Sequence, residues 1–84
     1  LSMISAQKIQ SLVEKAMPGS RVEAEDTTGT NDHFQVLVVS PSFEGKGMVE
    51  RHRMIYGILG SEVGGAIHAL SLKTLTPSEA EKRS

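Results

Sequence analysis

The first apolar pattern along the chain has the period of a helix. Its apolar residues recur at spacings of three and four: Ile9, Leu12, Val13 and Ala16. That spacing places them on one face of a helix. Ser5 can cap its start, because a serine hydroxyl accepts a hydrogen bond from a free backbone N–H of the first turn. Met17-Pro18-Gly19 predicts its end, since proline cannot continue the helical hydrogen bonds.

Two stretches with the pattern of strands follow. In residues 21–25, Val22 and Ala24 alternate with charged residues, as in a half-buried strand. Residues 33–40 are rich in β-branched and aromatic side chains and give the strongest strand signal. Residues 26–32 between them are turn-forming and lack a large apolar side chain. A loop this short predicts that the two strands are antiparallel.

The second half predicts a helix, a third strand and a short terminal helix. The helix is marked by residues on one side of a helical pattern: Met48, Val49, His52, Ile55, Tyr56, Leu59 and Val63. Gly64-Gly65 predicts its end, and residues 66–74 have the pattern of a strand. Thr76-Pro77-Ser78-Glu79 is a capping box with proline at the first helical position. Because a helix joins the second and third strands, they are expected to be parallel in a right-handed crossover.

The predicted order is α-β-β-α-β-α, a small α/β domain with a three-stranded mixed sheet and helices packed on one face. Residues 3–80 are expected to form this single domain, and 81–84 a C-terminal tail. Leu1 and Ser2 precede Met3, a candidate native start, and are expected to be a vector-derived remnant. A chain of 84 residues is long enough for one modest core.

Composition narrows the class of protein. The chain has no cysteine, which excludes disulfides, a thiol nucleophile and a zinc site built on its own sulfur. A formal net charge of −1 argues against binding nucleic acid through net charge alone. No apolar run approaches the ~18 residues of a membrane span, and no leader sequence is evident. We expect a soluble cytoplasmic protein, or one of an organelle matrix or stroma whose transit peptide has been removed.

Catalytic motifs are missing from the sequence. It has no Gly-x-Ser-x-Gly elbow, no Gly-x-Gly-x-x-Gly and no phosphate-binding loop. An enzyme is therefore not expected.

Two histidines are predicted to lie on one rim of the sheet. His33 opens the second strand and His68 lies at the start of the third, and parallel strands begin at the same edge. Neutral imidazole is the commonest metal ligand in proteins, so the pair is a candidate for half of a metal site. Asp26 or Asp32 could add an oxygen, and a partner would supply the rest. The alternative is a pair of ordinary, hydrogen-bonded histidines at strand ends.

A local basic cluster consists of Lys46, Arg51 and Arg53. In a DNA-binding protein these side chains would contact phosphates while the helix approached a groove. The alternative is a solvated helix face, since Glu50 and Glu62 are interspersed. His52 follows the apolar period and is expected at the edge of the core.

Four segments together resemble the BolA family. They are Phe-Glu-Gly-Lys at 43–46, Arg-His-Arg-Met-Ile-Tyr at 51–56, Ile-His-Ala-Leu-Ser-Leu-Lys at 67–73 and Thr-Pro at 76–77. The resemblance implies a fold like that of class II KH domains. It also implies a monothiol glutaredoxin as partner and a bridging [2Fe–2S] cluster, held on the other side by the glutaredoxin cysteine and a glutathione thiol.

The resemblance also assigns residues. His68 corresponds to the family histidine of the Ile-His-Ala-Leu segment, and His33 resembles the second ligand of histidine-type members. The isolated chain is not expected to hold a cluster, because four-ligand clusters normally need thiolates. Some BolA relatives act on transcription, so a DNA-binding regulator is the alternative function. A homodimer is the alternative assembly.

Overall fold

Residues 4–83 are described in the computed structural model and follow the helix–strand order that the hydrophobic pattern predicts. The elements are α1 (Ala6–Ala16), β1 (Arg21–Asp26), β2 (His33–Val39), α2 (Met48–Leu59), β3 (Ala69–Leu75) and α3 (Pro77–Arg83), with 3₁₀ turns at Pro41–Phe43 and Gly60–Glu62. Leu1, Ser2 and Met3, and with them the expected remnant and domain start, lie outside the described residues, as does Ser84.

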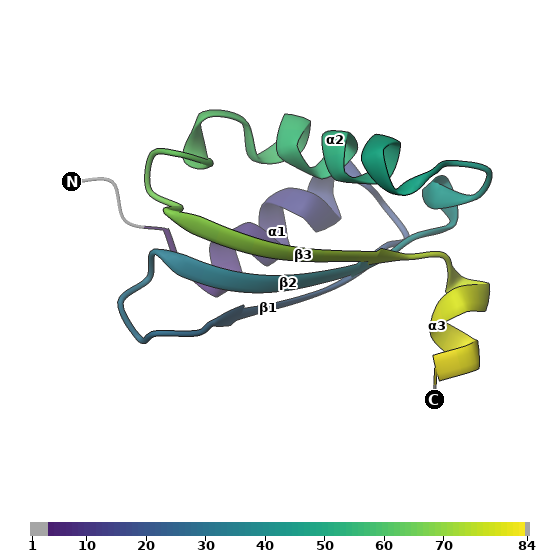
Figure 1. The fold of residues 1–84 in the computed structure, drawn as a ribbon, viewed down its shortest axis with the longest axis horizontal. Coiled ribbons are helices and arrows are strands. Elements are labelled where there is room, and N and C mark those ends of the chain that lie inside the picture. Colours follow the sequence, from purple (N-terminus) through teal and green to yellow (C-terminus); the bar gives the residue numbers. More distant parts are fainter. Residues whose placement is uncertain (1–3, 84) are drawn as a thin grey trace.

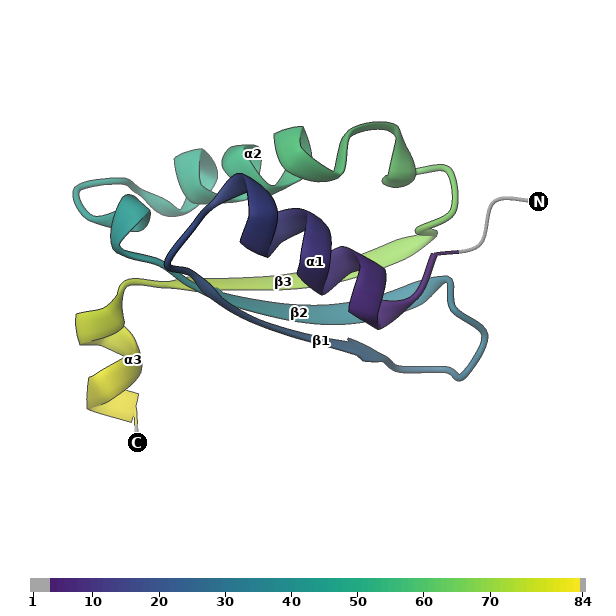
Figure 2. The ribbon, with the colours of Figure 1, turned by 180° about the vertical axis from the view of Figure 1, so that it is seen from behind.

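The sheet of the described residues has the order β1-β2-β3. β1 pairs with β2 antiparallel and β2 pairs with β3 parallel, as the loop length and the helical crossover predict. α1 and α2 lie side by side on one face of this sheet, whereas α3 turns away at the far end of β3, on the other side (Figures 1 and 2). The expectation that all helices pack on one face therefore holds for α1 and α2 and is wrong for α3.

The core lies between the sheet and helices α1 and α2. Its most deeply buried apolar residues are Ile9, Val13, Phe34, Val36, Val38, Phe43, Ile55 and Ile67. Each element contributes by its own period: β2 alternates, whereas α1 contributes residues four apart. Burial of one such side chain stabilises the fold by about 1.5–3 kcal/mol.

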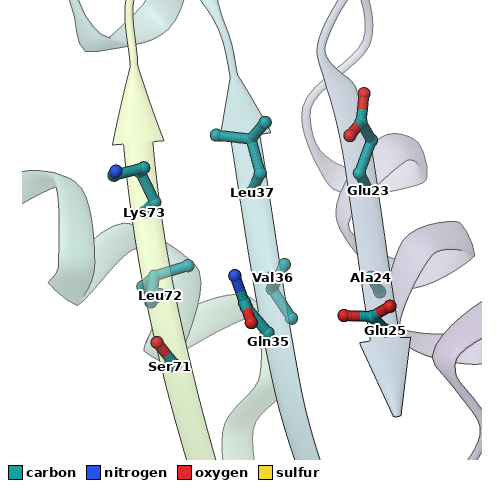
Figure 3. Close-up of a pocket in the computed structure, with 9 residues that line it drawn as sticks. All are labelled: Glu23, Ala24, Glu25, Gln35, Val36, Leu37, Ser71, Leu72 and Lys73. Carbon is teal, nitrogen blue, oxygen red and sulfur yellow. The ribbon is translucent and has the colours of Figure 1, made fainter. Parts of the chain in front are cut away.

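The opposite face of the sheet carries mostly polar side chains and is open. Register aligns Glu23, Leu37 and Lys73 in one row across the three strands, and Figure 3 shows them side by side. A polar, solvated face opposite the core face is common in sheets with antiparallel strands.

Helix α2 is shorter and less buried than its apolar pattern predicts. It ends at Leu59, because Gly60 adopts a positive φ of 57° and caps it, so Val63 lies outside the helix. Ile55 and Leu59, four residues apart, face the core. Val49 and Tyr56 lie on its outer side, 65% and 41% exposed. The apolar positions in the sequence therefore cover more of the helix surface than the part that packs on the sheet. At the end of α1, Ala16 is exposed and the next residue, Met17, which caps the helix, is buried in its place.

The third strand begins at Ala69, three residues later than predicted, and ends one residue later, at Leu75. Ile67 is buried before the strand starts, and its N–H bonds to the Glu62 carbonyl (2.8 Å) in a turn. Apolar character therefore continues upstream of the strand, which is why the pattern suggested an earlier start. His68 immediately precedes the strand.

The capping box at the start of α3 is confirmed. Thr76 Oγ1 accepts from the Glu79 N–H (3.1 Å), and Glu79 Oε1 accepts from the Thr76 N–H (2.8 Å). The helix continues to Arg83, so most of the segment expected to be a tail is helical.

Candidate metal centre

The parallel pairing of β2 and β3 brings the two candidate histidines to one rim, the left end of the sheet in Figure 1. His33 is in register with Ala69, so His68, one residue earlier, lies next to it. The ring centroids are 6.4 Å apart and the rings are perpendicular. The prediction that they share one rim is confirmed, and Asp32 of the preceding loop lies beside both rings.

Both imidazoles are accessible from outside. The side chain of His33 is 44% exposed and that of His68 is 62% exposed. A hollow of about 230 Å³ borders His33, between the starts of β2 and β3; Thr27, Phe34 and Leu70 are among its lining residues. The rim therefore offers two ring edges and an adjacent surface to a partner.

Asp32 lies between the two rings. Its Oδ1 accepts a hydrogen bond from His33 Nδ1 (2.8 Å), and its Oδ2 lies 3.3 Å from His68 Nδ1. Its backbone carbonyl also accepts from the N–H groups of His68 (2.7 Å) and Ala69 (3.2 Å), which joins the loop to the start of β3. The hydrogen bond from the Thr30 hydroxyl, followed by that from His33, lowers the pKa of Asp32 to about 2.

The loop itself is held by Asp26. Its Oδ1 accepts from the N–H groups of Thr28 (3.2 Å) and Gly29 (3.0 Å), and its Oδ2 accepts from that of Asn31 (3.0 Å). An aspartate that bonds the backbone of its own turn organises that turn. Asp26 is thus engaged within the loop, away from the role of metal ligand that the sequence left open for it.

The rim supplies two nitrogen donors. Across residues 4–83 no group of three or more His, Cys, Asp and Glu side chains is placed to hold a metal ion. A bridging cluster whose other two ligands come from a partner needs two donors from this chain, and two accessible imidazoles fit that requirement. His33 and His68 are the residues that would hold it.

The basic cluster is organised differently from its prediction. The side chain of Arg51 is only 11% exposed. Its Nε donates to the Lys46 carbonyl (2.8 Å), and its Nη1 donates to the Thr74 carbonyl (3.3 Å) and to Glu79 Oε1 (2.7 Å). Its guanidinium lies 5.8 Å from the centre of the Phe43 ring. The hydrogen bond from Arg51 is the main cause that lowers the pKa of Glu79 to about 2.

Arg51 therefore joins α2 to β3 and α3, and little of its side chain is exposed for the phosphate contact that the sequence suggested. Arg53 is exposed and Lys46 is half-buried. Without the Arg51 guanidinium, the three residues do not form one exposed cationic patch. His52 is half-buried, at the edge of the core as expected.

The position of Asp32 between the rings and the partners of Arg51 were not predicted from the sequence. The signal for Asp32 was its place directly before His33 at the end of a turn-rich loop. The contact with His68 depends on the register of β3 against β2, which no local pattern specifies. The Arg51–Glu79 pair joins residues 28 apart in sequence and depends on packing in the same way.

The fold and the rim define a class: a small α-β-β-α-β-α domain, with a mixed sheet and two histidines at the edge where β2 and β3 begin. The chain belongs to the BolA family, since the family model described as BolA-like protein matches residues 7–79. This confirms the family that the four sequence segments resemble.

Relatives agree with this assignment along nearly the whole chain. BolA-like protein 2 of Homo sapiens is 40% identical over 78 residues, which cover 90% of each chain. The structure of a bolA protein homologue from Coxiella burnetii is similar with a TM-score of 0.78 and 44% identity, covering 94% of this chain and 99% of that one. The solution structure of yeast Fra2 has a TM-score of 0.75 and 30% identity, covering 94% and 86%. These matches confirm the predicted fold class.

As for membranes, the helices within the described range are all too short or too polar to cross one.

Proposed function

We propose that this protein is a binding partner of a monothiol glutaredoxin and supplies His33 and His68 as ligands to a shared [2Fe–2S] cluster. The observation that carries the proposal is the pair of accessible imidazoles on one rim, 6.4 Å apart, in a chain without cysteine. Membership of the BolA family supports it, because that resemblance implies such a partner. We propose a binding role rather than catalysis, in the cytoplasm or in an organelle matrix.

The donor chemistry favours transfer or regulation over permanent electron storage. Imidazole ligands raise the reduction potential of an iron–sulfur centre relative to thiolates, as in Rieske centres. An imidazole can also be protonated, so its bond to a metal is released more readily in acid. We therefore propose that the shared cluster serves iron–sulfur trafficking or iron and redox regulation.

Mixing the purified protein with a cluster-loaded monothiol glutaredoxin and glutathione is expected to form a heterodimer with a changed visible absorption and circular dichroism spectrum. The change is expected because nitrogen ligands replace sulfur ligands on one side of the cluster. Size-exclusion chromatography and visible circular dichroism measure the two effects. Glutaredoxin without a cluster is the control, and its mixture with this protein should show no visible absorption or circular dichroism. A heterodimer whose cluster spectrum equals that of glutaredoxin alone would contradict the ligand role.

A further inference from the structure

Four side chains contact the carboxylate of Asp32: the hydroxyls of Thr28 (3.4 Å) and Thr30 and the rings of His33 and His68. Its Oδ1 accepts hydrogen bonds from His33 Nδ1 (2.8 Å) and from the hydroxyl of Thr30. Its Oδ2 lies 3.3 Å from His68 Nδ1. Asp32 is also less exposed than either histidine, at 27% of its side chain. One carboxylate thus faces the same ring atom, Nδ1, of both histidines.

This geometry determines where the ring protons lie. Aspartate is ionised at neutral pH, and an ionised carboxylate only accepts hydrogen bonds. A neutral imidazole has one N–H and one lone pair, so a nitrogen bonded to a carboxylate must carry the proton. His33, whose Nδ1 bonds to Asp32 Oδ1, therefore keeps its lone pair on Nε2. The same holds for His68 when its Nδ1, 3.3 Å from Oδ2, donates to that oxygen. Nε2 is then the atom available to a metal.

We propose that Asp32 is a positioning residue that holds both His33 and His68 with Nδ1 protonated and turned inward, so that both present Nε2 outward as donors. That this arrangement helps to bind the cluster rests on the proposed function. Carboxylates that bond the second nitrogen of a metal-binding histidine orient the ring and raise its basicity. Here a single carboxylate bonds to the ring of His33 at the start of β2 and lies 3.3 Å from the ring of His68, directly before β3.

The backbone of the loop is held by hydrogen bonds that do not involve the Asp32 carboxylate, which accepts within the loop only from the hydroxyls of Thr28 and Thr30. The Asp26 carboxylate bonds three backbone N–H groups of the turn, and Thr27 N–H bonds to the His33 carbonyl (3.0 Å). The links from Asp32 to His68 and Ala69 use its backbone carbonyl. Asp32→Asn retains that carbonyl and nearly the same volume, but replaces one acceptor oxygen by an NH₂ donor. Because each oxygen of Asp32 faces a different ring, the single oxygen of the amide faces only one of them and the NH₂ faces the other.

The test is the tautomer of each histidine in the isolated full chain. Two-bond ¹H–¹⁵N correlation spectra in mildly alkaline buffer, where imidazole is neutral, distinguish a protonated from an unprotonated ring nitrogen. We expect His33 and His68 both to be protonated at Nδ1. In Asp32→Asn, at least one ring is expected to move its proton to Nε2. Glu25→Gln, which neutralises an exposed carboxylate of β1, is the matched control and should leave both tautomers unchanged.

A wild-type protein with either ring protonated at Nε2, or an Asp32→Asn variant with unchanged tautomers, would overturn the proposal. Amide spectra of the variant check that the fold is intact. This test uses no metal, so its outcome is independent of the glutaredoxin partnership.

A second measurement tests the link to the cluster. Asp32→Asn is expected to weaken formation of the cluster-bridged glutaredoxin complex by about 10–100-fold, with partial recovery in Asp32→Glu. Unchanged affinity in Asp32→Asn would overturn its role in presenting the ligands. If the wild-type protein forms no cluster complex at all, the proposed function fails, whereas the tautomer spectra still decide what Asp32 does to the two rings.

Discussion

His68→Ala is expected to weaken the cluster-bridged complex with a monothiol glutaredoxin by more than about 10–100-fold. That range is the loss of metal affinity when a residue that only supports a metal ligand is removed. The loss should be this large because we propose the imidazole as a direct ligand, and this chain has no cysteine thiolate to replace it. The remaining donor, His33, would leave one coordination position to water or to a weaker group. Titration of cluster-loaded glutaredoxin, followed by visible circular dichroism, measures the affinity and the spectrum together.

The controls for His68→Ala follow from its surroundings. Its side chain is 62% exposed, so thermal unfolding should change little and the loss cannot be attributed to unfolding. Arg53→Ala removes an exposed cation of α2 and is expected to leave the complex unchanged. A His68→Ala protein that binds with wild-type affinity and an unchanged cluster spectrum would refute the ligand role.

Phe43→Ala is expected to lower the free energy of unfolding by about 3–5 kcal/mol, as for other buried aromatic side chains. The ring is fully buried, and the Arg51 guanidinium lies 5.8 Å from its centre. The substitution would also remove the ring beside Arg51, the residue that links α2 to β3 and α3. Since native proteins have only about 5–15 kcal/mol of stability, a loss of this size should shift the urea midpoint strongly downward.

Urea unfolding followed by far-ultraviolet circular dichroism measures this loss. Phe43→Leu retains much of the apolar volume and is expected to cost clearly less. Tyr56→Ala removes an aromatic ring that is 41% exposed, and it serves as the surface control. A loss below about 1 kcal/mol in Phe43→Ala would mean that the ring adds little beyond an average substitution.

The sequence predicts the rim because local rules suffice for it. A short loop makes β1 and β2 antiparallel, and a helical crossover makes β2 and β3 parallel, so His33 and His68 begin neighbouring strands at one edge. Their 6.4 Å separation then depends on register, which the structure supplies. The candidate pair was thus predictable, but the arrangement of its rings was not.

Other features depend on contacts that periodicity does not encode. The sequence has glycines at 57, 60, 64 and 65, and the backbone conformation of Gly60 alone decides where α2 ends. Arg51 lies on a helix whose charges suggested a solvated face, yet Glu79 and the Thr74 carbonyl draw it inward from distant parts of the chain. Charge patterns describe which residues are polar; packing decides which of them meet.

Whether two imidazole nitrogens of this chain bind the shared cluster can be measured by pulsed electron paramagnetic resonance of the reduced complex. The protein is labelled with ¹⁵N only at histidine and combined with unlabelled glutaredoxin and glutathione. We expect ¹⁵N hyperfine couplings from two nitrogens, one of which disappears in His68→Ala and the other in His33→Ala. A reduced cluster in the heterodimer without any ¹⁵N coupling would show that neither histidine is a ligand.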